Sequence, residues 1–69
     1  MNRRPVASSR LHAVGYDAKT GNLEVEFPDG TVWVYHGVPR EVYVSLLTAP
    51  SIGRYFNRYV VGAYDYERL

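Results

Sequence analysis

The residues best suited to chemistry in this sequence lie at the start of a predicted helix. Ser51 is a good N-cap, Gly53 allows close approach to the backbone, and the free N–H groups of the first turn favour an anion. Arg54 and Arg58, four residues apart, share one helix face and could clamp phosphates, while Asn57 could read a base or sugar edge. The sequence therefore predicts a ligand site for an anion or RNA at these five residues. The alternative is structural: Ser51 only caps the helix, Gly53 relieves crowding against a sheet, and the arginines form a solvated face.

No pattern in the sequence is typical of an enzyme. None of the serines is accompanied by a histidine and a carboxylate at a recognised nucleophile elbow, and there is neither a cysteine nor a glycine-rich phosphate loop. His12 and His36 lack metal-ligand spacing with each other or with a carboxylate. We therefore expect a protein that is not an enzyme, with no catalytic residue, no metal ligand and no cofactor.

Arginine supplies seven of the eight basic side chains, and these lie in two zones on either side of an acidic one. The first zone holds Arg3, Arg4 and Arg10 within residues 1–10, a segment without periodicity. This segment is predicted to be a flexible basic arm, which could follow a nucleic-acid backbone or serve only as a solubilising start. The net charge of +1 is too small to indicate nucleic-acid binding by itself.

The length of 69 residues allows one domain, which we assign to residues 11–69. Without cysteine, a domain this small needs a dense aromatic core or self-association for stability. No apolar run is long enough to span a bilayer, and no signal-peptide core follows the basic start. The sequence therefore predicts a cytoplasmic protein with no membrane partner.

Periodicity predicts three strands followed by two helices. The strands are expected at residues 11–16, 23–27 and 31–36, and the period changes to a helical one after Pro39. Ala49-Pro50 ends the first helix, Ser51 begins the second, and residues 63–69 form an extended or β-strand tail. The predicted fold is α+β: a three-stranded antiparallel β-meander packed by two short helices.

The turn between the second and third strands decides where the aromatic side chains of the third strand point. A two-residue loop would place Trp33 and Tyr35 on the exposed glutamate face, because a one-residue slip reverses every side chain. A three-residue loop at 28–30, which we favour, places both in the core. Val32 and Val34 would then lie on the glutamate face, where they could support self-association.

Tyrosines next to arginines in the second helix suggest base stacking as well as packing. The pairs Arg54-Tyr55 and Arg58-Tyr59 are compatible with stacking on single-stranded RNA. Both tyrosines also fit the apolar stripe of the helix, and this core interpretation is the one we favour.

The second half of the sequence resembles a known family through several short motifs. They are Gly37-Val38-Pro39, Val42-Tyr43, Leu46-Leu47-Thr48-Ala49, Ser51-x-Gly53-Arg54-Tyr55-Phe56-Asn57 and Tyr64-x-Tyr66-Glu67-Arg68. Together with Val14-Gly15-Tyr16-Asp17, these motifs closely resemble the KTSC domain, over about residues 8–69. The central Tyr-x-Tyr of the family appears here as Trp33-Val34-Tyr35, and Ile52 stands where members commonly carry a basic residue.

The resemblance implies a small binding module. KTSC domains occur at the C-terminus of some lysyl-tRNA synthetases and as short stand-alone proteins of bacteria and phages, and the synthetase attachment suggests RNA binding. We expect the partner to be RNA, either tRNA or single-stranded, or a small phosphate-bearing ligand. The alternatives are a protein-interaction module, such as a phage protein aimed at a host factor, and a module that sequesters a nucleotide signal between copies. Self-association would use Val32 and Val34.

Overall fold

The computed structural model describes residues 3–8 and 10–69, which form an α+β fold with one sheet. All neighbouring strands are antiparallel, and their order in the sheet follows their order in the sequence. The strands are β1 (Arg4–Pro5), β2 (Ala13–Asp17), β3 (Asn22–Glu26), β4 (Val32–Tyr35) and β5 (Tyr66–Arg68). The α+β class is confirmed, but the prediction of a three-stranded sheet was wrong, because this sheet has five strands.

The two additional strands lie in the segments that carry the weakest periodicity. The tail forms β5 on the outer side of β4, which is one of the two forms expected for it. At the other end, β1 pairs with β2 through Arg4 and Pro5, inside the segment predicted as a flexible arm over 1–10. That prediction also covers Met1, Asn2 and Ser9, which lie outside the described residues.

The β3–β4 turn has the three-residue geometry that the sequence favours. The backbone N–H of Phe27 donates to the carbonyl of Thr31 at 2.9 Å, and Gly30 has a φ of 89°. Glycine adopts this left-handed conformation without a steric penalty. In the resulting register Val25 lies opposite Trp33 and Leu23 opposite Tyr35, so the predicted faces are confirmed.

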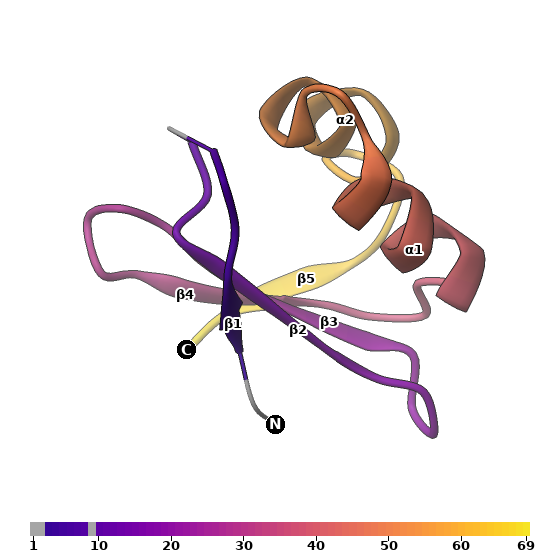
Figure 1. Cartoon of the computed structure of the whole chain (residues 1–69). Helices are drawn as coiled ribbons and strands as arrows, with labels where there is room; N and C mark the ends of the chain where they lie inside the picture. The colour runs from indigo at the N-terminus through magenta and orange to yellow at the C-terminus, as the bar shows by residue number, and fades with distance from the viewer. Residues whose placement is uncertain (1–2, 9) are drawn as a thin grey trace.

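Two short helices pack on the same side of the sheet (Figure 1). Helix α1 spans Arg40–Thr48 and helix α2 spans Ile52–Tyr59. Pro39 is the residue before α1 rather than its first helical residue, and Pro50 separates the two helices because proline cannot continue a helix. The β3–β4 hairpin extends beyond both helices in Figure 1. Within the described residues no helix is long and apolar enough to cross a membrane.

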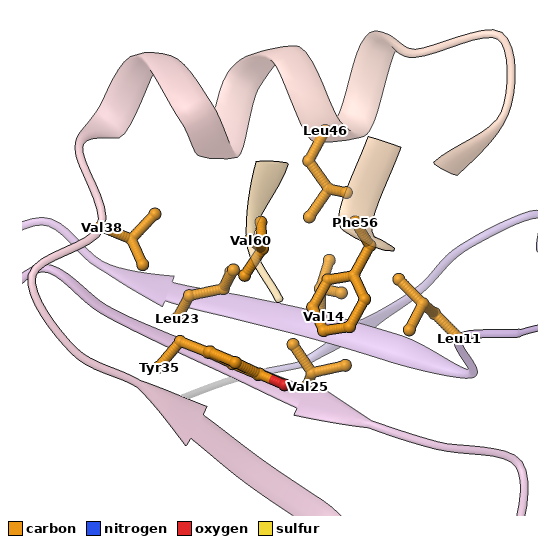
Figure 2. Close-up of a cluster of buried hydrophobic side chains, with 9 residues drawn as sticks. All are labelled: Leu11, Val14, Leu23, Val25, Tyr35, Val38, Leu46, Phe56 and Val60. Atoms are coloured by element: carbon orange, nitrogen blue, oxygen red, sulfur yellow. The ribbon is translucent and has the colours of Figure 1, made fainter. Parts of the chain in front are cut away.

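The core lies between the helices and the inner face of the sheet. Side chains from both helices meet side chains from three strands (Figure 2). The buried cluster consists of Leu11, Val14, Leu23, Val25, Tyr35, Val38, Leu46, Phe56 and Val60. Tyr35 is therefore core, as expected, whereas Trp33 lies on the expected face but is only partly buried.

On the polar outer face of the sheet, the glutamates are more buried and better paired than the sequence suggests. Glu24 is only 8% exposed, and the guanidinium of Arg3 pairs with it and with Glu26, at 3.2 Å for Glu26. The expectation of an exposed glutamate face was therefore wrong for Glu24. Val34 is buried beside these glutamates and Val32 is half-buried, so self-association through the two valines stays a prediction.

Candidate functional site

Helix α2 begins with the cap that the sequence predicts. The hydroxyl oxygen of Ser51 accepts a hydrogen bond from the backbone N–H of Arg54 at 3.4 Å, and its carbonyl accepts from the N–H of Tyr55 at 3.0 Å. Among the described residues, no acceptor is recorded for the N–H groups of Ile52 and Gly53. These two donors and the positive end of the helix dipole favour an anion at this point.

Gly53 lies against a side chain from a distant part of the sequence, which leaves no room for a Cβ. A Cβ placed on Gly53 would lie 2.7 Å from Cδ of Arg10 and 3.2 Å from its Cβ and Cγ. The aliphatic stem of Arg10 therefore lies directly on the helix backbone at this position. Both sequence-based explanations for Gly53, ligand approach and crowding against the sheet, missed this contact.

A small polar hollow of about 230 Å³ lies where Arg10 meets the start of α2. Ser8, Arg10, Ser51 and Gly53 are among the residues that line it. The hydroxyl oxygen of Ser8 accepts hydrogen bonds from the N–H groups of Arg10 and Leu11, at 3.1 and 3.4 Å. These bonds shape the loop that brings Arg10 to the helix. The guanidinium is bonded to Cδ, so its charge lies close to the start of α2.

The remaining predicted site residues lie further along α2. Arg54, Asn57 and Arg58 are exposed, and the guanidinium carbon of Arg58 is 5.7 Å from the ring centroid of Tyr59. Asn57 borders a separate groove instead of the hollow. The structure thus brings Ser51 and Gly53 together with Arg10, which the sequence analysis had assigned to an arm, and places Asn57 apart from them.

The surface around α2 carries positive charge that no neighbouring acid neutralises. Within the described residues, the ion pairs involve Arg3 and His36, and none involves Arg10, Arg54 or Arg58.

Tyr59 is 49% exposed, so the expectation that it packs in the core was wrong. Its ring lies 4.6 Å from that of Tyr55, which is half-buried.

The groove that Asn57 borders is larger, about 650 Å³, and five of its ten lining residues are aromatic. Trp33 is one of them, with the ring of Phe27 at 6.4 Å in an edge-on arrangement and the ring of Tyr66 at 5.0 Å. Phe56 and Val61 line it from the helix side. The groove exists because the helices stop short of the β3–β4 hairpin. No pattern in the sequence predicts this groove, in which Tyr66 is 55% exposed.

Two ionisable groups at the groove have shifted pKa values. Burial raises the pKa of the Tyr35 hydroxyl above its ordinary value of 10.0, and the neighbouring Tyr66 raises it further. Hydrogen bonds from the N–H and hydroxyl of Thr31, at 2.9 and 2.7 Å, lower the pKa of the Asp29 carboxyl below 3.8.

Of the two histidines, His36 makes side-chain contacts that link strands of the sheet. The ring of His36 lies between Asn22 Oδ1 and Glu67 Oε1, both at 3.0 Å, and so connects β3 to β5 across the outer face. In the described part of the chain, no group of three or more His, Cys, Asp or Glu side chains is placed to hold a metal ion.

Comparisons with known proteins agree on one family. Residues 7–64 match the family model described as the KTSC domain. An uncharacterised protein of Stutzerimonas stutzeri is 47% identical over 58 residues, which are 84% of this chain and 82% of that protein. A lysine–tRNA ligase of Nostoc punctiforme is 41% identical over 61 residues, which are 88% of this chain but 11% of the ligase. The crystal structure of a KTSC domain protein from Yersinia pestis has a TM-score of 0.93 at 33% identity, covering 99% of this chain and 96% of that one.

Proposed function

This chain belongs to the KTSC domain family, and we propose that it binds RNA through the phosphate backbone at the start of α2. The observation that carries the proposal is the position of Arg10. Its stem lies on Gly53, and its charge therefore adds to the free N–H groups of Ile52 and Gly53 at one polar hollow. A phosphate at this hollow would receive charge-assisted hydrogen bonds from both sources.

The exposed arginines of α2 extend this site along the helix. Arg54 and Arg58 lie one helical turn apart, and the described residues provide no acid that pairs with them. Successive phosphates of a strand could contact Arg10, Arg54 and Arg58 in turn. Such contacts position a nucleic acid without reading its sequence.

A relative supports RNA as the ligand over other phosphate compounds. The lysine–tRNA ligase of Nostoc punctiforme, which by its name acts on tRNA, contains a segment 41% identical to this chain. This chain spans only about a tenth of that ligase, so the activity of the ligase does not transfer to it. What supports the proposal is that a segment similar to this chain occurs within an enzyme that, by its name, acts on tRNA.

The test is the salt dependence of RNA binding, measured by fluorescence anisotropy with a single-stranded oligonucleotide and with tRNA. Replacing Arg10, Arg54 and Arg58 by Gln keeps much of each stem and removes three charges. We expect the triple variant to weaken binding and to reduce the slope of log K against log[salt] by about 2 for single strands, or about 0.7 for each lost phosphate contact.

The matched control removes the same number of charges elsewhere. Arg4, Arg40 and Arg68 are also exposed, and replacing all three by Gln gives the same net charge. The slope of this control should stay near that of the original protein. Equal losses in both triple variants would assign binding to net charge alone, and no binding at low salt would rule out the function itself.

A further inference from the structure

The edge of the sheet formed by β5 has backbone groups that no other strand uses. The N–H of Leu69 donates to the carbonyl of Val32 and the N–H of His36 donates to that of Asp65, both at 2.8 Å. In an antiparallel ladder such bonded pairs alternate with non-bonded ones. Tyr66 therefore points its N–H and C=O away from β4, as does Arg68. No strand in the described part of the chain lies on that side.

The aromatic groove opens beside the same edge. Tyr66 is opposite Tyr35 in the sheet, its side chain lies on the inner face, and its ring forms one side of the groove over Trp33. Tyr66 is 55% exposed and Val61, across the groove, is 47% exposed. A strand added to β5 would place alternate side chains on this inner face, next to Tyr66. Backbone pairing and an apolar groove are thus available to one extended segment.

The charge on the outer face selects what kind of segment fits. Glu67 lies on that face, where its Oε1 contacts His36 Nε2 at 3.0 Å and two-thirds of its side chain is exposed. Pairing β5 with β5 of a second copy around this residue would place two Glu67 carboxylates opposite each other, at a Cα separation of about 4.5 Å. Like charges in that position are destabilising, whereas a basic residue opposite Glu67 is favourable. The edge therefore suits a partner strand with a basic residue better than a copy of itself.

We propose that β5 and the aromatic groove bind an extended segment of another protein by strand addition. The segment carries apolar residues that face Tyr66 and the groove, alternating with a lysine or arginine opposite Glu67. Its backbone pairs with Tyr66 and Arg68. This surface is separate from the hollow at the start of α2, so the two proposals can fail independently.

The experiment is an NMR titration of the ¹⁵N-labelled chain with a blocked heptapeptide that alternates valine and lysine. We expect the largest shifts at the backbone amides of Tyr66 and Arg68 and at the Trp33 indole. The same peptide with alternate backbone amides methylated keeps every charge and loses donors for pairing. It should shift these signals at least several-fold less at equal concentration.

The charge rule is tested by Glu67→Lys, which reverses the outer-face charge. The original chain should prefer the valine–lysine peptide over a valine–glutamate peptide by about two- to five-fold per charge pair. The variant should reverse that preference. An unchanged preference, or equal shifts with the methylated peptide, would overturn the proposal. So would concentration-dependent shifts at Tyr66 without peptide, which indicate a second copy, or larger shifts there with oligouridine, which indicate RNA.

Discussion

Gly53 shows how a single residue depends on a distant side chain. Glycine lowers helix stability, so its presence in α2 requires a compensating reason. The reason is steric: the stem of Arg10 occupies the volume that a Cβ would need. The same contact holds the cation beside the helix start. Gly53 leaves space on the surface of α2 and the stem of Arg10 fills that space, so each residue depends on the other.

A double-mutant cycle tests this coupling. Gly53→Ala in the original chain should change the free energy of unfolding little or lower it, because the gain in helix propensity is offset by displacement of Arg10. In an Arg10→Ala background the contacts with Cδ and Cγ are absent and only the contact with Cβ at 3.2 Å remains. The same substitution should therefore be more favourable there than in the original chain, by up to about 1 kcal/mol. Urea unfolding of the four proteins measures both changes. Additive effects would show that the two side chains do not interact.

This site is only partly predictable from the sequence, for a physical reason. Ser51 was predictable because a helix cap depends on local geometry, and the cap is confirmed. Arg10 was not, because its position depends on a loop shaped by Ser8 and on packing against a helix much later in the chain. A glycine early in an amphipathic helix was the available signal, since it implies that something approaches the helix closely.

At the scale of elements, β1 is a two-residue strand whose attachment depends on side chains. Pro5 has no N–H to donate, so it suits the edge position that β1 occupies. The neighbouring Arg3 extends over the outer face to Glu24 and Glu26. A segment without hydrophobic periodicity is thus joined to the sheet by an ion pair, which is why periodicity alone counted too few strands.

Removing that ion pair should lower stability measurably. In Arg3→Ala, the nearly buried carboxylate of Glu24 loses its partner, and we expect a loss of about 1–2 kcal/mol in the free energy of unfolding. Arg4→Ala is the matched control, because Arg4 is exposed and should stay within about 0.5 kcal/mol. Urea unfolding at pH 7 measures both. If the two variants lose the same stability, the ion pair does not hold β1.

The turn at residues 28–30 was predictable because its chemistry is local. Proline, aspartate and glycine each suit one position of a three-residue loop, and Gly30 has the left-handed φ that such a loop needs. This single turn fixes the register of β3 against β4. The correct faces of Trp33 and Tyr35 followed from it, and so did the burial of Tyr35, whereas the partial exposure of Trp33 did not.

At the scale of the whole molecule, the reach of the helices along the sheet explains the exposure of Trp33. Trp33 and Tyr35 lie on the same face of β4, so their different burial depends on their position along the strand. The β3–β4 hairpin extends beyond both helices, and Trp33 is nearer to the hairpin than Tyr35 (Figure 1). Tyr35 lies under the helices, and Trp33 lies where they end, which creates the groove.

The burial of Tyr35 predicts how the whole fold responds to alkali. Because its folded-state pKa is raised above 10.0, its contribution to stability is fully present below about pH 10 and is lost as pH rises through the folded pKa. Within that window the free energy of unfolding should fall by up to about 1.4 kcal/mol per pH unit. Tyr35→Phe should remove this component, as urea unfolding from pH 8 to 11 would measure. If the free energy of unfolding falls equally with pH in both proteins, groups other than Tyr35 cause the loss of stability in alkali.

The position of β5 also has a consequence for solubility. It covers one side of β4, whose four residues, Val32 to Tyr35, are all strong strand formers without charge. Uncovered, this strand would be the kind of uncharged apolar edge that recruits identical strands into aggregates. β5 replaces it with an edge that carries Glu67 and Arg68. The three residues of β5 therefore protect β4 from pairing with other chains, although β4 is only one strand away from the edge of the sheet.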